Sequence, residues 1–263
     1  MNTRDVQMLL ASVGLYDGGI DGIDGRKTLR GVNEALRGIG RDWPQHRRLV
    51  GAGQAVLNKL GHEAGPVDGF VGHNTREALA AWHYKRLNGT SEVVSRNPTP
   101  SRYDASDLTR QSDVGAFYGQ PGPQIQRQLT PVDLPFAMRL DWDMTTTVQR
   151  VTLHKKCARS FAMAMSAVKE EYGLRRIRSL GLDRFAGGYN HRKMRGGSKW
   201  SMHAYGCAVD IYAAPNGLRT RCPDALFCAP EYRDFLDIME AHNWLPAIRL
   251  WGADAMHFQQ ARL

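Results

Sequence analysis

Residues 1–90 contain an internal repeat with a period of 47 residues and no gap between the two copies. A repeat at a fixed period constrains the fold strongly, because each copy must form the same small unit and bury its apolar face against its neighbour. The identical positions are Gly14 and Gly61, Asp21 and Asp68, Gly22 and Gly69, Gly25 and Gly72, and Thr28 and Thr75.

Each copy is predicted to form a helix, a loop and a second helix. The apolar residues before Gly14 have helical spacing, and Gly14 supplies a C-terminal stop. The pair Asp21-Gly22 is typical of a turn, and Asn74 with Glu77 resembles a capping box before the second helix of copy two. One copy is too short to bury much apolar surface alone, so the two copies are expected to pack together as a small all-α domain.

The composition of the chain changes after residue 90. Helix breakers are frequent and apolar residues are few from Asn88 to Pro123. This stretch predicts a semi-extended linker over residues 91–117, between a first domain at 1–90 and a second domain at 118–263.

The second domain is expected to mix helices and strands. An apolar stripe predicts a helix over about residues 148–172, with Gly173 as its stop. Pro230 opens a predicted last helix over residues 231–242, and alternating polarity predicts a strand over residues 209–212.

Two pairs of polar residues in the second domain have the spacing of metal ligands. His203 and Asp210 flank Gly206, which lets the chain bend between them, and Asp254 lies three residues before His257. Two imidazoles and one carboxylate are a common protein complement for a catalytic zinc ion, and a further carboxylate serves as general base. The alternative is that each histidine is an ordinary polar side chain, which the combined pattern disfavours.

The last pair needs a particular backbone shape. In a straight strand Asp254 and His257 would face opposite sides, so the chain is expected to bend at Gly252-Ala253 or just after Asp254. Serine hydrolysis is a competing chemistry, because Ser201 lies two residues before His203. The stretch lacks the Gly-x-Ser-x-Gly elbow, which argues against that chemistry.

These residues resemble the signature of a known family. Ser-x-His-x-x-Gly-x-Ala-x-Asp followed by Asp-x-x-His is similar to the motif of the M15 zinc peptidases, which include D-alanyl-D-alanine carboxypeptidases and the L-alanyl-D-glutamate endopeptidases of phage endolysins. The resemblance runs from about Tyr118 to the C-terminus and implies an α+β domain with an antiparallel sheet. It also implies one zinc ion per chain, held by His203, Asp210 and His257, with Asp254 as catalytic base.

The same resemblance implies residues that contact the substrate. The glycine-rich run over residues 187–197 is similar to the part of the family that binds substrate and transition state, and Arg192 is the residue we assign to that role. Core packing is the alternative role for Trp251, and Ser201 is expected to hydrogen-bond close to the metal. The expected substrate-binding residues are Ser201, Tyr189, His191 and Trp251.

The repeat resembles a second family. Leu-Gly-x-x-x-Gly-x-Val-Asp-Gly-x-x-Gly-x-x-Thr, over residues 60–75, is similar to the peptidoglycan-binding domain attached to many wall hydrolases. The resemblance implies wall contacts at Asp68 and Gly69, and at Asp21 and Gly22 in copy one, which departs from the pattern. The alternative is a spacer without a ligand; calcium is disfavoured because each loop lacks a ladder of oxygen donors.

The charge of the chain bears on its partners. The chain has 35 Lys and Arg against 26 Asp and Glu, a net charge of +9, which favours an anionic partner such as a bacterial wall or, weakly, an anionic membrane surface. Both parts of the chain share this excess, which argues against nucleic acid. We expect a monomer.

The ends and cysteines bear on location. The sequence has no signal-peptide pattern and no apolar run of about 18 residues, so we expect synthesis in the cytoplasm of a host bacterium and action in the periplasm or wall after the membrane is permeabilised. Cys207 is expected to be a buried small hydrophobe. Cys222 and Cys228 either pair after export or remain free thiols.

Together these features predict an endolysin-like peptidoglycan hydrolase, which cleaves an amide bond of the stem peptide with a zinc-activated water. One alternative is a bacterial D-alanyl-D-alanine carboxypeptidase. The other is a wall-binding protein without catalytic activity.

Overall fold

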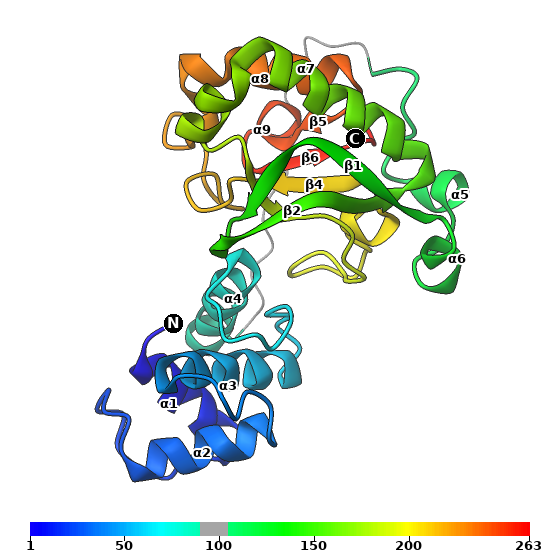
Figure 1. Cartoon of the computed structure of the whole chain (residues 1–263). Helices are drawn as coiled ribbons and strands as arrows, with labels where there is room; N and C mark the ends of the chain where they lie inside the picture. Colours follow the sequence, from blue (N-terminus) through cyan, green and yellow to red (C-terminus); the bar gives the residue numbers. More distant parts are fainter. Residues whose placement is uncertain (90–104) are drawn as a thin grey trace. The chain divides into compact units, whose positions relative to one another are not determined.

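The computed structural model describes residues 1–89 and 105–263. The chain divides into two compact units, Met1–Glu92 and Val93–Leu263, each with its own hydrophobic core (Figure 1). We call them the N-terminal unit and the C-terminal unit. The expected linker, residues 91–117, falls partly on residues 90–104, which lie outside the described residues.

The N-terminal unit is helical throughout its described regular elements. Each copy of the repeat forms a helix, a loop and a second helix, as its pattern predicts, and α3 packs against the other helices of the unit. The bounds are α1 (Thr3–Ser12) and α2 (Arg26–Leu36) in copy one, and α3 (Gln45–Lys59) and α4 (His73–Asn88) in copy two.

A buried glutamine organises the loop of each copy. In copy two the Gln54 side-chain amide donates to the Asp68 carboxylate (2.9 Å), the Phe70 carbonyl (2.9 Å) and the Thr75 hydroxyl (3.0 Å). The Gln54 oxygen accepts the backbone N–H groups of Asp68 (3.1 Å) and Gly69 (2.8 Å). Because these bonds satisfy the polar groups of the loop internally, the loop can lie against the core.

Copy one repeats this arrangement around Gln7. Its side-chain amide donates to the Asp21 carboxylate (2.7 Å) and the Thr28 hydroxyl (3.2 Å), and its oxygen accepts the N–H of Gly22 (2.9 Å). Gln7 and Gln54 occupy equivalent places in the two copies and are almost completely buried. The repeated aspartates and threonines are therefore partners of a repeated glutamine.

The helix caps differ from one expectation. The capping box proposed for Asn74 and Glu77 is wrong, because the N-cap of α4 is Gly72, two residues before Asn74, and makes no side-chain cap hydrogen bond. A capping box is present in copy one, where Asn2 and Asp5 exchange hydrogen bonds at the start of α1.

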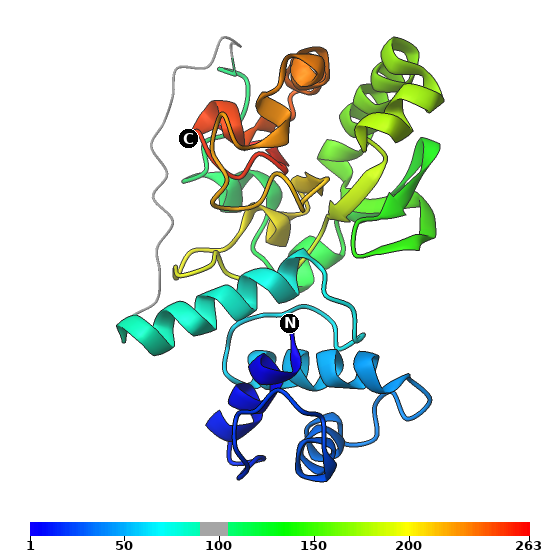
Figure 2. The ribbon, with the colours of Figure 1, turned by 90° about the vertical axis from the view of Figure 1, so that its left-hand side faces the viewer.

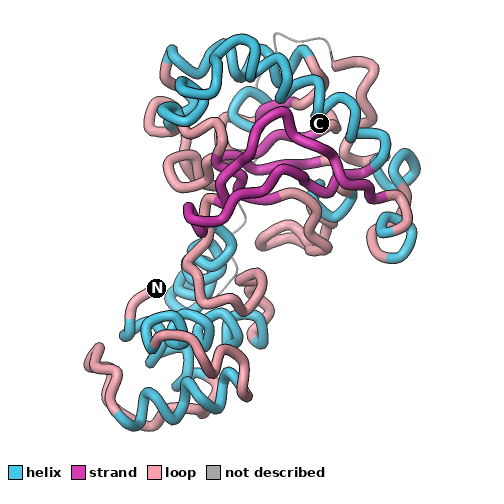
Figure 3. Tube along the Cα trace, in the orientation of Figure 1, coloured by secondary structure: helices cyan, strands magenta, loops and turns pink. Residues whose placement is uncertain are grey.

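The C-terminal unit is built on one mixed sheet. The strand order in the described residues is β2-β1-β3-β4-β6-β5 (magenta in Figure 3). The expectation of an antiparallel sheet is correct for most pairs but wrong for β1 and β3, which are parallel. The strands are β1 (Leu129–Leu140), β2 (Asp143–His154), β3 (Arg184–Gly187), β4 (Ala208–Ile211), β5 (Leu245–Pro246) and β6 (His257–Gln259).

Helices of the C-terminal unit pack on this sheet. α7 lies along the hairpin formed by β1 and β2 (Figure 2), and α8 packs against α7 and β5. Among the described residues, no helix combines the length and apolar character that crossing a bilayer requires. The helical segments are α5 (Val114–Tyr118), α6 (Pro123–Gln126), α7 (Lys155–Leu180), η1 (Met202–Tyr205), η2 (Leu226–Cys228), η3 (Pro230–Tyr232), α8 (Arg233–Ala241) and α9 (Ala247–Leu250).

The long helix begins later than predicted. Residues 148–154 belong to β2, where they pair with β1, so the expected helical start at 148 is wrong. His154 ends the strand and caps α7, since its side chain accepts the N–H of Lys156. Gly173 does interrupt the helical backbone (φ 65°, ψ 157°), but the helix resumes after it and continues to Leu180.

Residues 105–117, which were expected in the linker, contact the C-terminal unit. Ala105 and Leu108 pack against a buried cluster that includes Trp251. The backbone N–H of Gln111 donates to the carbonyl of Arg262 (2.7 Å). The fold of the C-terminal unit therefore begins before residue 118.

The cysteines fall into two classes. Cys222 and Cys228 form a disulfide, which decides between the two alternatives for this pair. Cys157 and Cys207 are free and buried. The expectation for Cys207 as a buried small hydrophobe is confirmed.

Candidate metal centre

The expected ligands converge from three elements of the C-terminal unit. Asp210 on β4 and His257 on β6 are direct partners in the antiparallel register. Directly opposite residues on neighbouring strands project from the same face, which brings their side chains together. His203 comes from η1, which Gly206 ends in a left-handed conformation (φ 67°). A Cβ at Gly206 would lie 2.8 Å from the backbone nitrogen of His154, so only glycine fits this bend.

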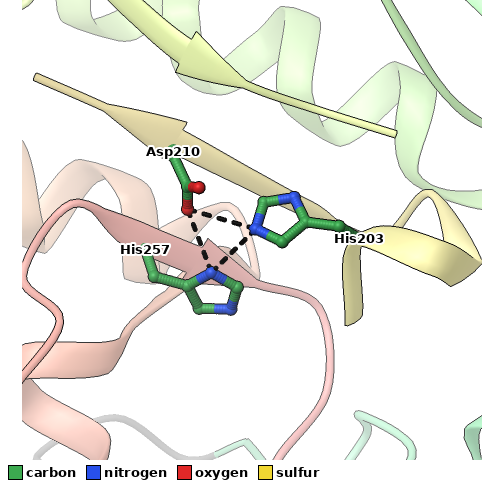
Figure 4. A group of neighbouring side chains, drawn as sticks. All are labelled: His203, Asp210 and His257. Atoms are coloured by element: carbon green, nitrogen blue, oxygen red, sulfur yellow. Dashed lines mark hydrogen bonds and ion pairs between the residues drawn. The ribbon is translucent and has the colours of Figure 1, made fainter. Parts of the chain in front are cut away.

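The three side chains meet at single atoms (Figure 4). His203 Nε2 lies 3.2 Å from Asp210 Oδ1 and 3.1 Å from His257 Nδ1. His257 Nδ1 lies 3.1 Å from Asp210 Oδ1. All three residues are buried, and in the described part of the chain they form a group that can hold a metal ion.

Hydrogen bonds on the outer side of each imidazole determine which nitrogen faces the group. His203 Nδ1 lies 2.8 Å from the Gly188 carbonyl, which can only accept, so Nδ1 carries the proton. His257 Nε2 lies 3.2 Å from the side-chain oxygen of Gln259. In its neutral form each imidazole therefore directs an unprotonated nitrogen into the group, which is the form that binds a metal ion.

The charge state of Asp210 suits metal binding. Burial raises the pKa of this carboxyl, but the charge and hydrogen bonds of His203 and His257 in their doubly protonated, cationic forms outweigh burial and hold its pKa well below the usual range. The carboxylate is thus ionised, which is the form that ligates metals. Two imidazole nitrogens and one carboxylate oxygen then form three convergent electron-pair donors.

The backbone bends before the last ligand, as its spacing predicts. Gly252 (φ 73°) and Asp254 (φ 62°) both have left-handed backbone conformations. The N–H of His257 donates to the carbonyl of Asp254 (2.9 Å), which closes the turn. Asp254 is buried and lies three residues before His257 in the sequence. Its role as catalytic base stays a prediction.

Arg192 lies in a hairpin that leads into η1. Lys193 pairs with Trp200 across this hairpin, and the N–H of Ser201 donates to the Arg192 carbonyl (3.1 Å). The guanidinium of Arg192 donates to the Lys193 carbonyl (3.2 Å) and has no carboxylate partner among the described residues. This hairpin carries Arg192, Lys193, Arg195 and Lys199 and no acidic residue.

The expected substrate-binding residues occupy different environments. Ser201 caps η1, because its hydroxyl accepts the N–H of His203 (3.4 Å). His191 is exposed and stacks on Trp200, with ring centroids 4.6 Å apart. Tyr189 is half-buried. Trp251 is only 1% exposed and packs beside the His257 ring, with centroids 5.9 Å apart, so core packing describes it better than an open surface.

The expected wall-binding residues lie in the glutamine-centred loops of the N-terminal unit. The carboxylates of Asp21 and Asp68 each accept hydrogen bonds from the buried glutamine of their copy and from a backbone N–H of their own loop. The backbone N–H groups of Gly22 and Gly69 donate to the buried glutamines. Wall binding by these four residues stays a prediction.

Several structurally important residues were not predicted from the sequence. Gln7 and Gln54 are one repeat period apart, so the repeat itself could have revealed them. Gln259 could have been suspected because it follows His257 by two residues and so shares its face of a strand. The sequence contains no signal for the Gly188 carbonyl or for Gln111.

Comparison of the chain with family models, with curated proteins and with solved structures finds no match. The functional conclusion therefore depends on the chemistry of the residues and their arrangement.

Proposed function

We propose that the chain is a zinc-dependent peptidoglycan hydrolase that cleaves an amide bond of the stem peptide. The observation that carries this proposal is the convergence of His203 Nε2, His257 Nδ1 and Asp210 Oδ1, with a hydrogen-bond acceptor behind each imidazole. Zinc bonds of about 2.0–2.2 Å in a tetrahedron separate ligand atoms by about 3.4 Å. The separations of 3.1–3.2 Å in this group are close to that spacing.

The donor set also favours a catalytic site. Structural zinc sites use four protein ligands, whereas catalytic sites use three and leave one position for water. Three donors converge among the described residues. Bound zinc would lower the pKa of its water towards about 7.

The remaining steps fall to residues of the chain. The Asp254 carboxylate accepts a proton from the attacking water and then donates it to the leaving amine. The Arg192 guanidinium offsets the negative charge that develops on the carbonyl oxygen, a role suited to a cation without a carboxylate partner. A site that excludes water strengthens the electrostatic interactions of both charged groups, because less water screens them.

Peptidoglycan is the substrate that best joins the two units. The resemblance of the repeat to wall-binding domains and the net charge of +9 both support an anionic wall polymer. Tethering by the N-terminal unit would raise the effective concentration of substrate at the metal centre. The competing functions remain a D-alanyl-D-alanine carboxypeptidase and a wall-binding protein without activity.

The decisive experiment combines metal content with hydrolysis. Purified protein should contain one zinc per chain and should reduce the turbidity of purified peptidoglycan, and His203→Ala should lose both properties. Mass spectrometry of the released fragments should find internal stem-peptide cleavage. Release of terminal D-Ala alone would favour the carboxypeptidase. Zinc without hydrolysis would favour the non-catalytic protein, and absence of zinc would refute the proposal.

A further inference from the structure

Gln259 lies behind the metal centre and contacts three other residues. Its side-chain oxygen is 3.2 Å from His257 Nε2 and 3.0 Å from the donating side-chain amide of Gln111. Its own amide nitrogen donates to the carbonyl of Ala261 (2.5 Å). Gln259 is completely buried, so water does not replace any of these partners.

These contacts fix the orientation of the Gln259 amide. The Ala261 carbonyl can only accept, which requires the amide nitrogen of Gln259 to point towards it. The Gln259 oxygen must then face His257, so His257 Nε2 is the donor. Gln111 donates to the same oxygen and disfavours a flipped amide, which would place two donors against each other.

We propose that Gln259, held by Gln111, is a positioning residue that orients His257 and keeps its Nδ1 available to the metal. This inference rests on the proposed zinc centre and adds two residues that hydrogen-bond behind one of its ligands. Hydrogen-bond acceptors behind ligating histidines set ring orientation and raise metal affinity. Residues 105–117, which contain Gln111, therefore contribute to the metal centre.

Backbone hydrogen bonds hold Gln111 in place. The N–H of Gln111 donates to the Arg262 carbonyl (2.7 Å), and the N–H of Arg262 donates to the Thr109 carbonyl (2.9 Å). The Arg262 guanidinium donates to the Leu108 carbonyl (2.9 Å). This clamp ties residues 108–111 to the strand end that follows Gln259.

Gln260 provides a matched control on the same strand end. It is adjacent to Gln259 and also buried, but its side-chain amide donates to the Ser160 hydroxyl. A loss of metal affinity caused only by removing a buried glutamine would appear in both Gln259→Leu and Gln260→Leu. A positioning role predicts the loss in Gln259→Leu alone.

The test measures metal binding of the full chain, using Zn²⁺ alone in competition with a chromogenic chelator. We expect zinc affinity to fall about 10–100-fold in Gln259→Leu, about fivefold in Gln111→Leu, which loses one hydrogen bond, and negligibly in Gln260→Leu. Gln259→Glu keeps an acceptor for His257 but loses the donor to the Ala261 carbonyl, so it should restore part of the affinity. The visible absorption of bound Co²⁺ should change in Gln259→Leu and stay unchanged in Gln260→Leu.

The outcomes separate this inference from the proposed function. Wild-type affinity and an unaltered Co²⁺ spectrum in Gln259→Leu would overturn the inference, whether or not the enzyme hydrolyses peptidoglycan. Equal losses in Gln259→Leu and Gln260→Leu would also overturn it. A selective loss would support it even if the wild-type protein binds zinc without hydrolysing the wall. If Gln111 acts through Gln259, the double variant should lose no more than Gln259→Leu.

Discussion

Gln54 allows a quantitative test of how the loops of the N-terminal unit are held. It is 1% exposed and makes five side-chain hydrogen bonds within copy two of the repeat. Gln54→Leu keeps a side chain of similar size and removes both the donor and the acceptor. The buried N–H of Gly69 and one carboxylate oxygen of Asp68 then lose a partner.

The expected loss of stability follows from these bonds. At about 1 kcal/mol net for each hydrogen bond, five of them contribute about 5 kcal/mol. Asp68 and Thr75 keep other partners, which reduces the cost, and the buried leucine returns about 1 kcal/mol or more. The free energy of unfolding should therefore fall by about 3 kcal/mol, a large part of the 5–15 kcal/mol (roughly) that a domain typically has.

Amide hydrogen exchange of the full chain can measure this loss locally. Peptides from α1 and α3 should exchange about 100-fold faster in Gln54→Leu, since 1.4 kcal/mol corresponds to a factor of ten. Gln45→Leu is the control, because Gln45 is exposed and bonds only the Asp24 side chain among the described residues. A change in Gln54→Leu no larger than that in the control would refute the structural role of the glutamine network.

Three further predictions concern the C-terminal unit. Asp254→Asn should keep zinc but lower turnover about 100-fold or more, whereas Asp210→Asn should lose zinc; zinc analysis and hydrolysis rates would show the reverse if the roles are exchanged. Burial lowers the pKa of His154, so the unfolded state binds more protons and stability should fall as pH drops below about 6.5. Urea melts at several pH values should show that the free energy of unfolding depends less on pH in His154→Asn; an unchanged pH dependence would contradict this. Replacing Cys222 and Cys228 by serine should cost about 2 kcal/mol in the same melts, and no loss would show that the closed loop does not stabilise the fold.

The regular elements of the N-terminal unit could be predicted because the repeat supplies the same local signals twice. Helical spacing, a glycine stop and an Asp-Gly turn recur in register, and each describes contacts close in sequence. The role of the turn aspartates was only partly predictable. Gln7 and Gln54 lie on the buried side of their helices among apolar residues. A pattern based on hydrophobicity does not predict that these polar residues are buried.

The start of α7 was not predictable from local spacing. Leu153 and Cys157 are four residues apart and fit a helical stripe, but Leu153 also fits the alternation of a strand. Pairing with β1 decides the outcome, because residues 148–154 complete the hairpin. Long-range pairing of this kind overrides local propensity.

The ligands of the candidate metal centre were predictable for a different reason. Their donor types and spacing predicted a common site, and the bend expected at Gly252-Ala253 or just after Asp254 is present, with left-handed backbone at Gly252 and Asp254. The residues that hydrogen-bond behind the ligands had no such constraint in the sequence. Gln259 shares a strand with a ligand, but Gln111 lies 148 residues earlier, in a stretch with few apolar residues.

The low apolar content around Gln111 also explains why composition places the start of the C-terminal unit too late, at residue 118. Composition identifies segments that bury side chains, and residues 105–117 have few apolar side chains to bury. Besides the packing of Leu108 and Val114, their attachment uses backbone hydrogen bonds between Gln111, Arg262 and Thr109, which any residue except proline can form. A boundary placed by composition therefore excludes Gln111, although its side chain reaches the hydrogen-bond network behind His257.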